Sequence, residues 1–283
     1  MTNEVFSLNN DVKIPAIGLG TFQMEPDDAE KATLEAIQDG YRLIDTANGY
    51  MNEKAVGRAI AKSGINREEL FISSKLWPTV YEKETAVDDT LRRLSLDYLD
   101  LLFLHQPSGD WKVGYRQLEK AYKEGKIKAI GISNFEGKEL DELLTFAEIK
   151  PQVIQFEAHP YFTAQKVMAT LKPYDTRLMA WYPLGHGDSS LMQQPIFTKL
   201  GEKYGKSNVQ IILRWHVQAG HIVIPGSTNP AHIKSNLDIF DFELTDEEMA
   251  EIAKLDTEKR YYNPNPEMVA GYAKMDMDFD SQK

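Results

Sequence analysis

The stretch LDLLFLH at residues 99–105 is an apolar run that ends on a histidine, and it decides the interpretation of the fold. The run is almost continuously apolar and does not alternate with polar residues, which is typical of a parallel strand covered on both faces. Seven further runs share this character: AIGLG (16–20), RLIDT (42–46), LFISSKL (70–76), IKAIGIS (127–133), QVIQFEA (152–158), RLMAWYPL (177–184) and HIVIPGS (221–227). The chain therefore contains eight candidate strands.

The segments between these runs have helical periodicity. In residues 27–39 and again in 136–147 the apolar side chains recur at spacings that place them on one face. Pro26 opens the first of these helices, and Gly40 follows its last turn. Eight strand-then-helix units predict an α/β fold, a (β/α)₈ TIM barrel. A doubly wound open sheet is the alternative, but its G-x-G-x-x-G fingerprint is missing.

Other segments lie outside the eightfold pattern. FSLNNDVKIP (6–15) predicts an N-terminal β-hairpin, and two extra helices are expected, one ending at Gly205 and one at 245–256. We expect the C-terminal tail from Thr257, which is rich in proline and aspartate, to be irregular and to fold over the barrel mouth. No low-complexity linker interrupts the chain, so residues 1–283 are expected to form a single domain.

The composition excludes several classes of protein. The chain has 283 residues, no cysteine and a formal net charge of −11. Without cysteine there is neither a disulfide scaffold nor a thiolate metal site, and the histidines lack metal-site spacing. The acidic balance disfavours nucleic-acid and anionic-lipid partners. No apolar run approaches the ~20 residues of a membrane helix, and MTNEVFSLNN lacks a signal-peptide pattern. We therefore expect a cytoplasmic protein with no metal site.

Four polar residues of complementary chemistry fall where three neighbouring strands end. Asp45, Lys75 and His105 close the second, third and fourth strands, and Tyr50 follows Asp45 by five residues. Polar residues at the carboxyl ends of barrel strands face the active-site mouth. Each one alone could be an incidental polar cap. A buried lysine, however, needs a partner, and Asp45 can supply it.

This set of residues suits reversible proton transfer to a carbonyl oxygen. An ammonium about 4 Å from a phenolate stabilises it by roughly 4 kcal/mol at a dielectric of ~20. Lys75 is therefore expected to lower the pKa of Tyr50 from its ordinary value of about 10, while His105 orients the carbonyl. Lys75 could instead act as the Schiff-base amine of an isomerase or aldolase, although Asp45 should keep it protonated.

Four longer segments carry a family resemblance: GYRLIDTANGYMNEKAVG (40–57), LDYLDLLFLHQP (96–107), EGKIKAIGISNF (124–135) and IPGSTNPAHIKSN (224–236). In them the chain resembles the aldo-keto reductase family, and most of all its bacterial 2,5-diketo-D-gluconate reductase-like branch. The resemblance implies an NAD(P)H-dependent oxidoreductase that reduces aldehydes and ketones to alcohols, with a small-molecule carbonyl as substrate. Hydride would come from the nicotinamide and the proton from Tyr50, with Asp45, Lys75 and His105 completing a catalytic tetrad. A catalytically idle, nucleotide-binding redox sensor of the same fold is the alternative.

The resemblance also assigns nucleotide contacts. Ser133, Asn134 and Gln155 match residues that bind the nicotinamide amide, and Trp181 takes the place of the aromatic residue that stacks on its ring, unless it is simply a core residue. The full set implied for the cofactor is Gly20, Thr21, Ser133, Asn134, Gln155, Trp181, Leu184, Gly185, Gly187, Ile224, Gly226, Ser227, Thr228, His232 and Asn236.

The last strand departs from the family pattern. Gly226 stands where relatives have a lysine, and His232 stands where they have an arginine. In relatives those two cations grip the 2′-phosphate of NADPH, and such charge-assisted contacts are the strong ones. We therefore expect NADPH or NADH as cofactor, with NADH accepted; Lys234 is the nearby cation that could compensate.

The substrate pocket is expected to include four aromatic or imidazole side chains by the same resemblance: Phe22, Trp77, His105 and Trp111. For Trp111, simple packing in the core is an equally open interpretation. The histidines outside the tetrad, among them His159, His186, His216 and His221, are interpreted as structural or surface residues.

Overall fold

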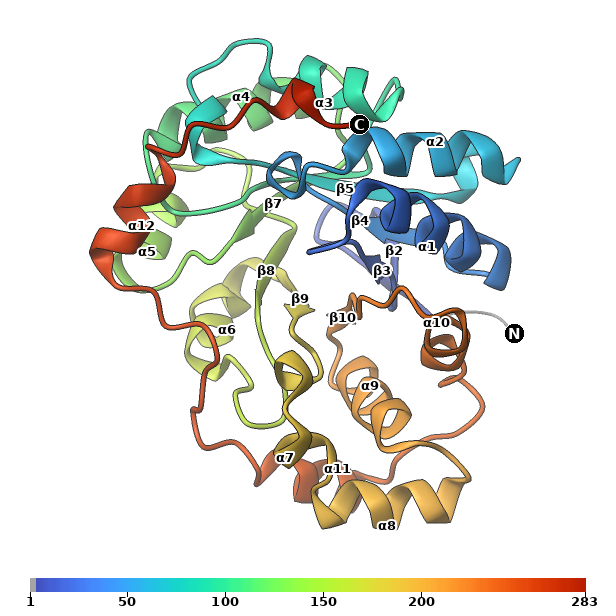
Figure 1. Cartoon of the computed structure of the whole chain (residues 1–283). Coiled ribbons are helices and arrows are strands. Elements are labelled where there is room, and N and C mark those ends of the chain that lie inside the picture. Colours follow the sequence, from blue (N-terminus) through green and yellow to red (C-terminus); the bar gives the residue numbers. More distant parts are fainter. Residues whose placement is uncertain (1–3) are drawn as a thin grey trace.

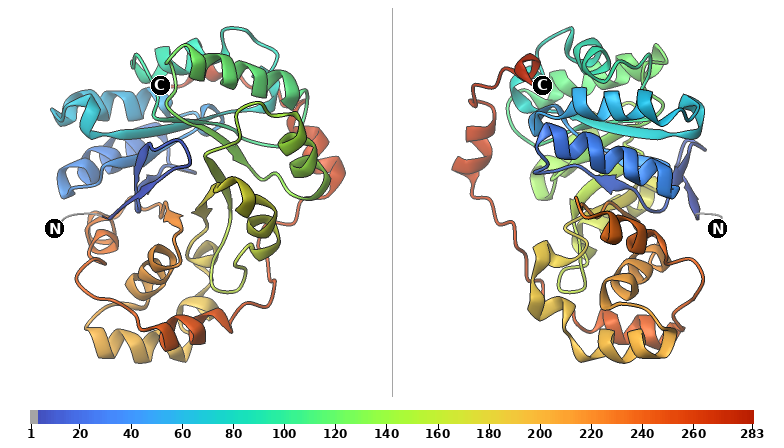
Figure 2. Two further views of the ribbon diagram at one scale, coloured as in Figure 1. Left: turned by 180° about the vertical axis from the view of Figure 1, so that it is seen from behind. Right: turned by 45° about the vertical axis from the view of Figure 1, so that its right-hand side comes forward.

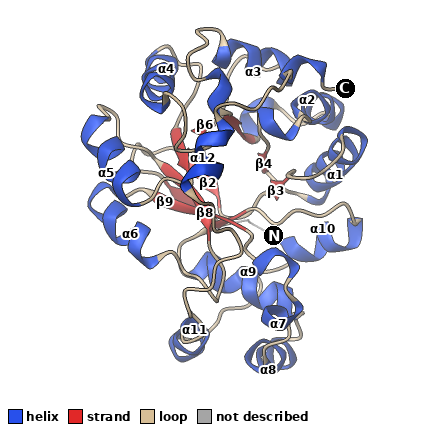
Figure 3. Ribbon diagram, turned by 60° about the vertical axis from the view of Figure 1, so that its left-hand side comes forward, coloured by secondary structure: helices blue, strands red, loops and turns tan. Residues whose placement is uncertain are grey.

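The strands form one parallel sheet that closes on itself. The computed structural model describes residues 4–283, so residues 1–3 of the expected domain lie outside the described residues. The strands run in the order β10-β9-β8-β7-β6-β5-β4-β3, and a parallel bridge between Ile17 and Val223 joins the two ends. Their bounds are β3 (Leu19–Gly20), β4 (Leu43–Asp45), β5 (Phe71–Leu76), β6 (Leu101–Leu104), β7 (Ile130–Ser133), β8 (Val153–Glu157), β9 (Arg177–Trp181) and β10 (Ile222–Val223). The predicted (β/α)₈ barrel is confirmed (Figure 3).

Eight helices alternate with the strands and surround them (Figure 1). They are α1 (Pro26–Asp39), α2 (Glu53–Ser63), α3 (Ala86–Leu94), α4 (Trp111–Lys123), α5 (Gly137–Phe146), α6 (Gln165–Leu171), α9 (Asn208–Gln218) and α10 (Pro230–Leu237). The start and stop signals act as expected: Pro26 is the first residue of α1, and Gly40 ends it in the left-handed conformation at φ 109°. The apolar faces of the helices pack on the outside of the strands and form the main core.

The two extra helices that were expected, α8 (Pro195–Tyr204) and α11 (Asp246–Ala253), lie close to their predicted positions, whereas the short helix α7 (Ser189–Met192) was not predicted. α7 and α8 follow β9, and Gly205 ends α8 as predicted. α11 begins with a capping box in which Thr245 and Glu248 satisfy each other's backbone N–H groups. Apolar residues of α8, α9 and α11 form a separate cluster beside the barrel.

The predicted hairpin closes the amino-terminal end of the barrel. β1 (Val5–Ser7) pairs antiparallel with β2 (Lys13–Pro15). Leu8 and Ile14 join the apolar side chains inside the barrel. The Asn9 side chain donates to the carbonyl of Tyr174, just before β9, at 2.9 Å, and Asn10 donates to Lys128, before β7, at 3.0 Å. The barrel therefore opens at its other end.

The C-terminal tail is more regular than predicted. It contains the helix α12 (Pro266–Tyr272), because Asn265 caps the backbone N–H of Met268 at 2.8 Å and Pro266 is favourable at the first helical position. The expected position over the mouth is observed: the indole N–H of Trp77 donates to the Tyr272 carbonyl at 3.0 Å. Figure 2 shows the tail as a strap that runs along one side of the molecule. No helix in residues 4–283 is long and apolar enough to cross a membrane.

Candidate active site

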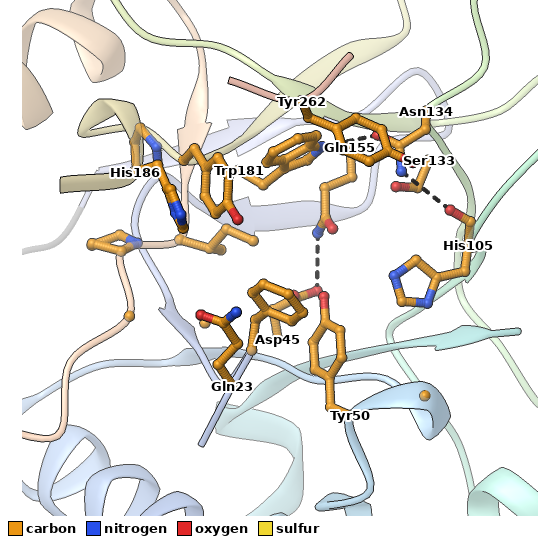
Figure 4. Close-up of a pocket in the computed structure, with 18 of the residues that line it drawn as sticks. Gln23, Asp45, Tyr50, His105, Ser133, Asn134, Gln155, Trp181, His186 and Tyr262 are labelled. Atoms are coloured by element: carbon orange, nitrogen blue, oxygen red, sulfur yellow. Dashed lines mark hydrogen bonds between the residues drawn. The ribbon is translucent and has the colours of Figure 1, made fainter. Parts of the chain in front are cut away.

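A cavity of about 530 Å³ opens at the carboxyl ends of the strands (Figure 4). Its wall includes most of the residues expected at the site: Gly20, Phe22, Asp45, Tyr50, Trp77, His105, Ser133, Asn134, Gln155, Trp181, Leu184, Gly187, Ile224 and Gly226. Side chains from both ends of the chain therefore meet in one place, as is usual for a barrel of this type. No lysine or arginine of the described chain lines this wall.

Asp45 and Lys75 form a buried ion pair beneath the cavity. The Lys75 Nζ lies 2.6 Å from the Asp45 Oδ2 and donates to the Thr46 carbonyl at 2.7 Å. Lys75 is fully buried, and Asp45 is 1% exposed. Burial lowers the pKa of Lys75, whereas the Asp45 carboxylate raises it. The Asp45–Lys75 ion pair predicted from the sequence is thus present, although the Lys75 side chain does not itself line the cavity.

Two neutral side chains also hold Asp45. Its Oδ1 accepts hydrogen bonds from the Ser73 hydroxyl at 2.7 Å and from the Gln155 amide at 3.1 Å. Gln155 comes from β8, on the opposite side of the barrel from β4. A carboxylate with three donors keeps one orientation, so Asp45 fixes the position of the Lys75 ammonium.

Tyr50 points into the cavity from a short 3₁₀ turn, Asn48–Tyr50, which follows β4. The Lys75 Nζ lies 4.6 Å from the centre of its ring. Burial raises the pKa of Tyr50 well above its ordinary value, and the Asp45 carboxylate raises it further. The lowered pKa that we expected is therefore wrong for this state. The physical reason is that Lys75 directs its N–H groups to Asp45 and Thr46, while the phenol is desolvated.

His105 lies across the cavity from Tyr50, with their ring centres 5.5 Å apart in an edge-on arrangement. Burial lowers the pKa of His105 well below its usual range, and the nearby Lys75 ammonium adds to this effect. Its Nδ1 is buried without a hydrogen-bond partner. The imidazole is thus neutral at neutral pH and can present one N–H to a ligand oxygen.

The residues expected at the nicotinamide lie together on one wall. Asn134 adopts a left-handed backbone at φ 64° and accepts a hydrogen bond from the Trp181 indole N–H at 3.1 Å. Trp181 is flanked by Tyr182 and Tyr262, at ring-centre distances of 4.6 and 5.5 Å. Trp181 is half-buried at the cavity and can offer a ring face to a planar ligand.

Beyond Trp181 the wall is made of backbone. A Cβ on Gly20 would lie 2.7 Å from the Ile224 carbonyl oxygen, and one on Gly226 would lie 3.0 Å from that of Gly20. Glycine at both positions lets the chain after β10 pack closely against the end of β3, so that Gly20, Ile224 and Gly226 line the cavity without a bulky side chain at either glycine. The Ser133 hydroxyl and the side-chain amides of Asn134 and Gln155, together with this glycine-lined wall, fit a ligand with an amide group and a dinucleotide backbone.

Several expected nucleotide residues do not line the cavity: Thr21, Gly185, Ser227, Thr228, His232 and Asn236. Thr21 is fully buried and donates to the Asp45 carbonyl at 3.1 Å, so it supports the site from below. The last four lie past the end of β10: Ser227 and Thr228 precede α10, His232 is in its first turn, and Asn236 is buried in its last turn. His232 is exposed there.

Trp111 is a correction. It is 8% exposed, does not line the cavity, and packs against Phe135 and Phe146 at ring-centre distances of 5.6 and 6.0 Å. As the first residue of α4, it turns its side chain towards the core between helix and strand. The open alternative, core packing, therefore describes Trp111, whereas Phe22 and Trp77 do lie in the wall.

The comparison with known proteins settles the family. Residues 16–257 match the Aldo/keto reductase family. The chain belongs to this family. It is 45% identical to "Glyoxal reductase" of Bacillus subtilis (strain 168) over 93% of this chain and 96% of the relative. It is 36% identical to "Methylglyoxal reductase DkgA" of Escherichia coli (strain K12) over 94% and 98%. These relatives confirm the branch indicated by the signature segments.

A solved structure gives the same answer for the fold. The aldo-keto reductase of Bombyx mori in complex with NADP superposes with a TM-score of 0.86 at 32% identity, covering 93% of this chain and 96% of that one. The present chain is thus a member of the aldo-keto reductases, which are a family of NAD(P)H-dependent oxidoreductases.

Sequence reasoning missed several lining residues of this aldo-keto reductase: Gln23, Gln106, Tyr182, His186, Met192, Tyr262 and Tyr272. His186, interpreted as structural or surface, stacks on Tyr182 at 4.2 Å beside the cavity. Gln106 follows His105 directly at the end of its strand, so its position in the cavity wall could have been predicted from the sequence. Tyr262 and Tyr272 come from the tail, and their hydroxyls lie 2.7 Å apart.

Proposed function

We propose that this chain reduces small aldehydes and ketones to alcohols, with NADH or NADPH as cofactor and Tyr50 as proton donor. The observation that supports it is the meeting of Tyr50, His105 and the buried Asp45–Lys75 pair at one cavity. When bound, the nicotinamide supplies the hydride. The composition supports a single domain acting in the cytoplasm.

The side chains of the site carry out proton donation, orientation of the carbonyl and stabilisation of the phenolate. Tyr50 stays protonated because it is buried, so it can donate its proton to the oxygen of a polarised carbonyl. Neutral His105 can donate a hydrogen bond to that same oxygen and orient it. Once Tyr50 has lost its proton, the Lys75 ammonium, 4.6 Å from the ring, stabilises the phenolate. Asp45 holds Lys75 in place for this purpose.

Turnover of glyoxal or methylglyoxal by the purified protein tests this proposal. We expect oxidation of NADH or NADPH on addition of the aldehyde, and a loss of at least a hundredfold in kcat for Tyr50→Phe with unchanged cofactor binding. Tyr98→Phe, at the closed end of the barrel before β6, is the matched control and should keep full activity. Full activity in Tyr50→Phe would remove the proposed role, and cofactor binding without turnover by the wild type would favour the idle sensor.

We further propose that NADH is accepted, since Gly226 and His232 replace the two cations that relatives use for the 2′-phosphate. Fluorescence titration with NADH and with NADPH tests this. We expect comparable dissociation constants, and about tenfold tighter NADPH binding on His232→Arg, in line with one charge-assisted contact. A wild type that binds NADPH tenfold more tightly than NADH would contradict the proposal.

A further inference from the structure

The C-terminal tip of the chain docks on the first turn of α2, the helix that follows Tyr50. The tip is the short 3₁₀ turn Phe279–Ser281 together with Gln282. Phe279 and Gln282 are 6% and 5% exposed, so the tip is a packed part of the protein. Its contacts reach residues more than 180 positions earlier in the sequence.

Gln282 supplies a helix cap that the local sequence does not. The residue at the N-cap of α2 is Asn52, a good capping residue, yet its side chain makes no cap. The Asn52 side chain is used elsewhere: it accepts from Thr46 at 2.7 Å and donates to the Thr21 carbonyl at 2.9 Å. The free backbone N–H of Lys54 donates instead to the Gln282 Oε1 at 2.9 Å.

Asp280 adds an ionic link to the same turn. Its carboxylate accepts from Arg92 at 2.9 Å and from Arg93 at 3.2 Å. Arg93 in turn donates to Glu53, the first residue of α2, at 2.5 Å. Glu53 is fully buried, and it also accepts from Ser74, which precedes Lys75 in β5, at 2.6 Å. The tip, α2 and the catalytic strand are therefore connected through one continuous set of bonds.

The geometry points to Asp280 and Gln282 as positioning residues for Tyr50. These two residues act through α2. They hold Glu53 and Lys54, the first two residues of that helix, and Glu53 is three residues after Tyr50. The turn that orients the phenol is therefore held in place. Displacement of a proton donor by about 1 Å can cost ~100-fold in rate, because transfer requires hydrogen-bond distance. The inference rests on the proposed function of Tyr50.

Kinetics of Gln282→Ala, Gln282→Glu and Ser281→Ala, assayed at 20 °C with NADH and methylglyoxal, test the inference. We expect Gln282→Ala to lower kcat about fivefold while KM and the NADH dissociation constant stay within twofold. Gln282→Glu keeps the acceptor oxygen for Lys54 but loses the N–H that donates to the Phe279 carbonyl at 2.7 Å, so it should recover part of the lost kcat. Ser281→Ala lies in the same tip, bonds only to the Asp278 carbonyl, and should behave as wild type. Asp280→Asn should show the same split between kcat and KM.

Hydrogen exchange of the Lys54 amide gives a second readout that does not depend on turnover. Its protection should fall at least tenfold in Gln282→Ala and return in Gln282→Glu. An unchanged kcat in Gln282→Ala, or equal defects in the Ala and Glu variants, would overturn the positioning role while leaving the proposed function intact. A wild type without reductase activity would instead overturn the proposed function, and the exchange result would still report on the cap.

Discussion

Replacement of Asp45 by asparagine should convert the buried ion pair into a buried single charge. In the wild type the Lys75 ammonium is fully buried and lies 2.6 Å from a carboxylate that is 1% exposed. The variant leaves the ammonium with one strong acceptor, the Thr46 carbonyl at 2.7 Å. Removing one partner of a buried pair costs about 3–5 kcal/mol when the other charge remains. We expect a loss of this size in the free energy of unfolding at pH 7.

The same variant should acquire a pH dependence. Burial already lowers the pKa of Lys75, and Asp45 is the main group that raises it. Without Asp45 the folded protein should release the Lys75 proton, whereas the unfolded chain keeps it up to a pKa of about 10.4. The unfolded state then binds one more proton, so stability increases with pH by about 1.4 kcal/mol per unit between the folded and unfolded pKa values.

Urea unfolding of wild type, Asp45→Asn and Asp45→Asn/Lys75→Met between pH 6 and pH 9 measures both effects. The double variant has no buried charge at this position, so it should recover stability and lose the extra slope. Ser73→Ala removes a neutral donor to Asp45 and serves as the control: it should cost about 1–2 kcal/mol with no added slope. If Asp45→Asn loses less than about 1 kcal/mol and shows the wild-type slope, the pair is not the charged unit described above.

Three further predictions concern stability. Burial lowers the pKa of His216 well below its usual range and that of His221 to about 4. The unfolded chain therefore takes up protons that the folded protein does not, and stability should fall as pH drops from about 6.5 to 4, with a contribution from His221 of about 2 kcal/mol after allowance for its partial exposure. Urea unfolding of His221→Gln should show a flatter decline, and an unchanged one would contradict the assignment. Gly57→Ala should destabilise by about 2 kcal/mol despite its better helix propensity, since the new Cβ would lie 2.3 Å from the Leu94 carbonyl oxygen. Gly271→Ala in α12 has open space and should stabilise by about 0.5–1 kcal/mol in the same thermal or urea assay, with equal effects at the two glycines arguing against this reasoning.

The barrel was predictable because its signals are local. Each buried strand is a short apolar run, and a polar residue at its end marks the mouth, so Asp45 and His105 could be placed at the site from strand ends alone. The partnership of Lys75 with Asp45 followed from the cost of burying a charge.

Apart from α12, what was missed depends on contacts that are distant in sequence. The local signal Asn265-Pro266 could have predicted α12, yet no pattern shows that Tyr262 and Tyr272 cover the cavity. The direction of the Tyr50 pKa depends on how deeply the phenol is buried and on where the Lys75 N–H groups point. Trp111 could not be assigned, because the first residue of a helix can face either the mouth or the core.

The tail that supplies Tyr262 and Tyr272 has a consequence for how such a protein can diverge. Among the described residues, the stretch 258–278, which carries Tyr262 and Tyr272 and ends before the docked tip, contributes no residue to the three buried apolar clusters that hold the barrel together. Part of the chamber wall is therefore built from a segment on which folding depends little. Substitutions there can reshape the chamber while the strands and the group of Asp45, Tyr50, Lys75 and His105 stay as they are, so the shape of the chamber can change at low cost to the stability of the scaffold.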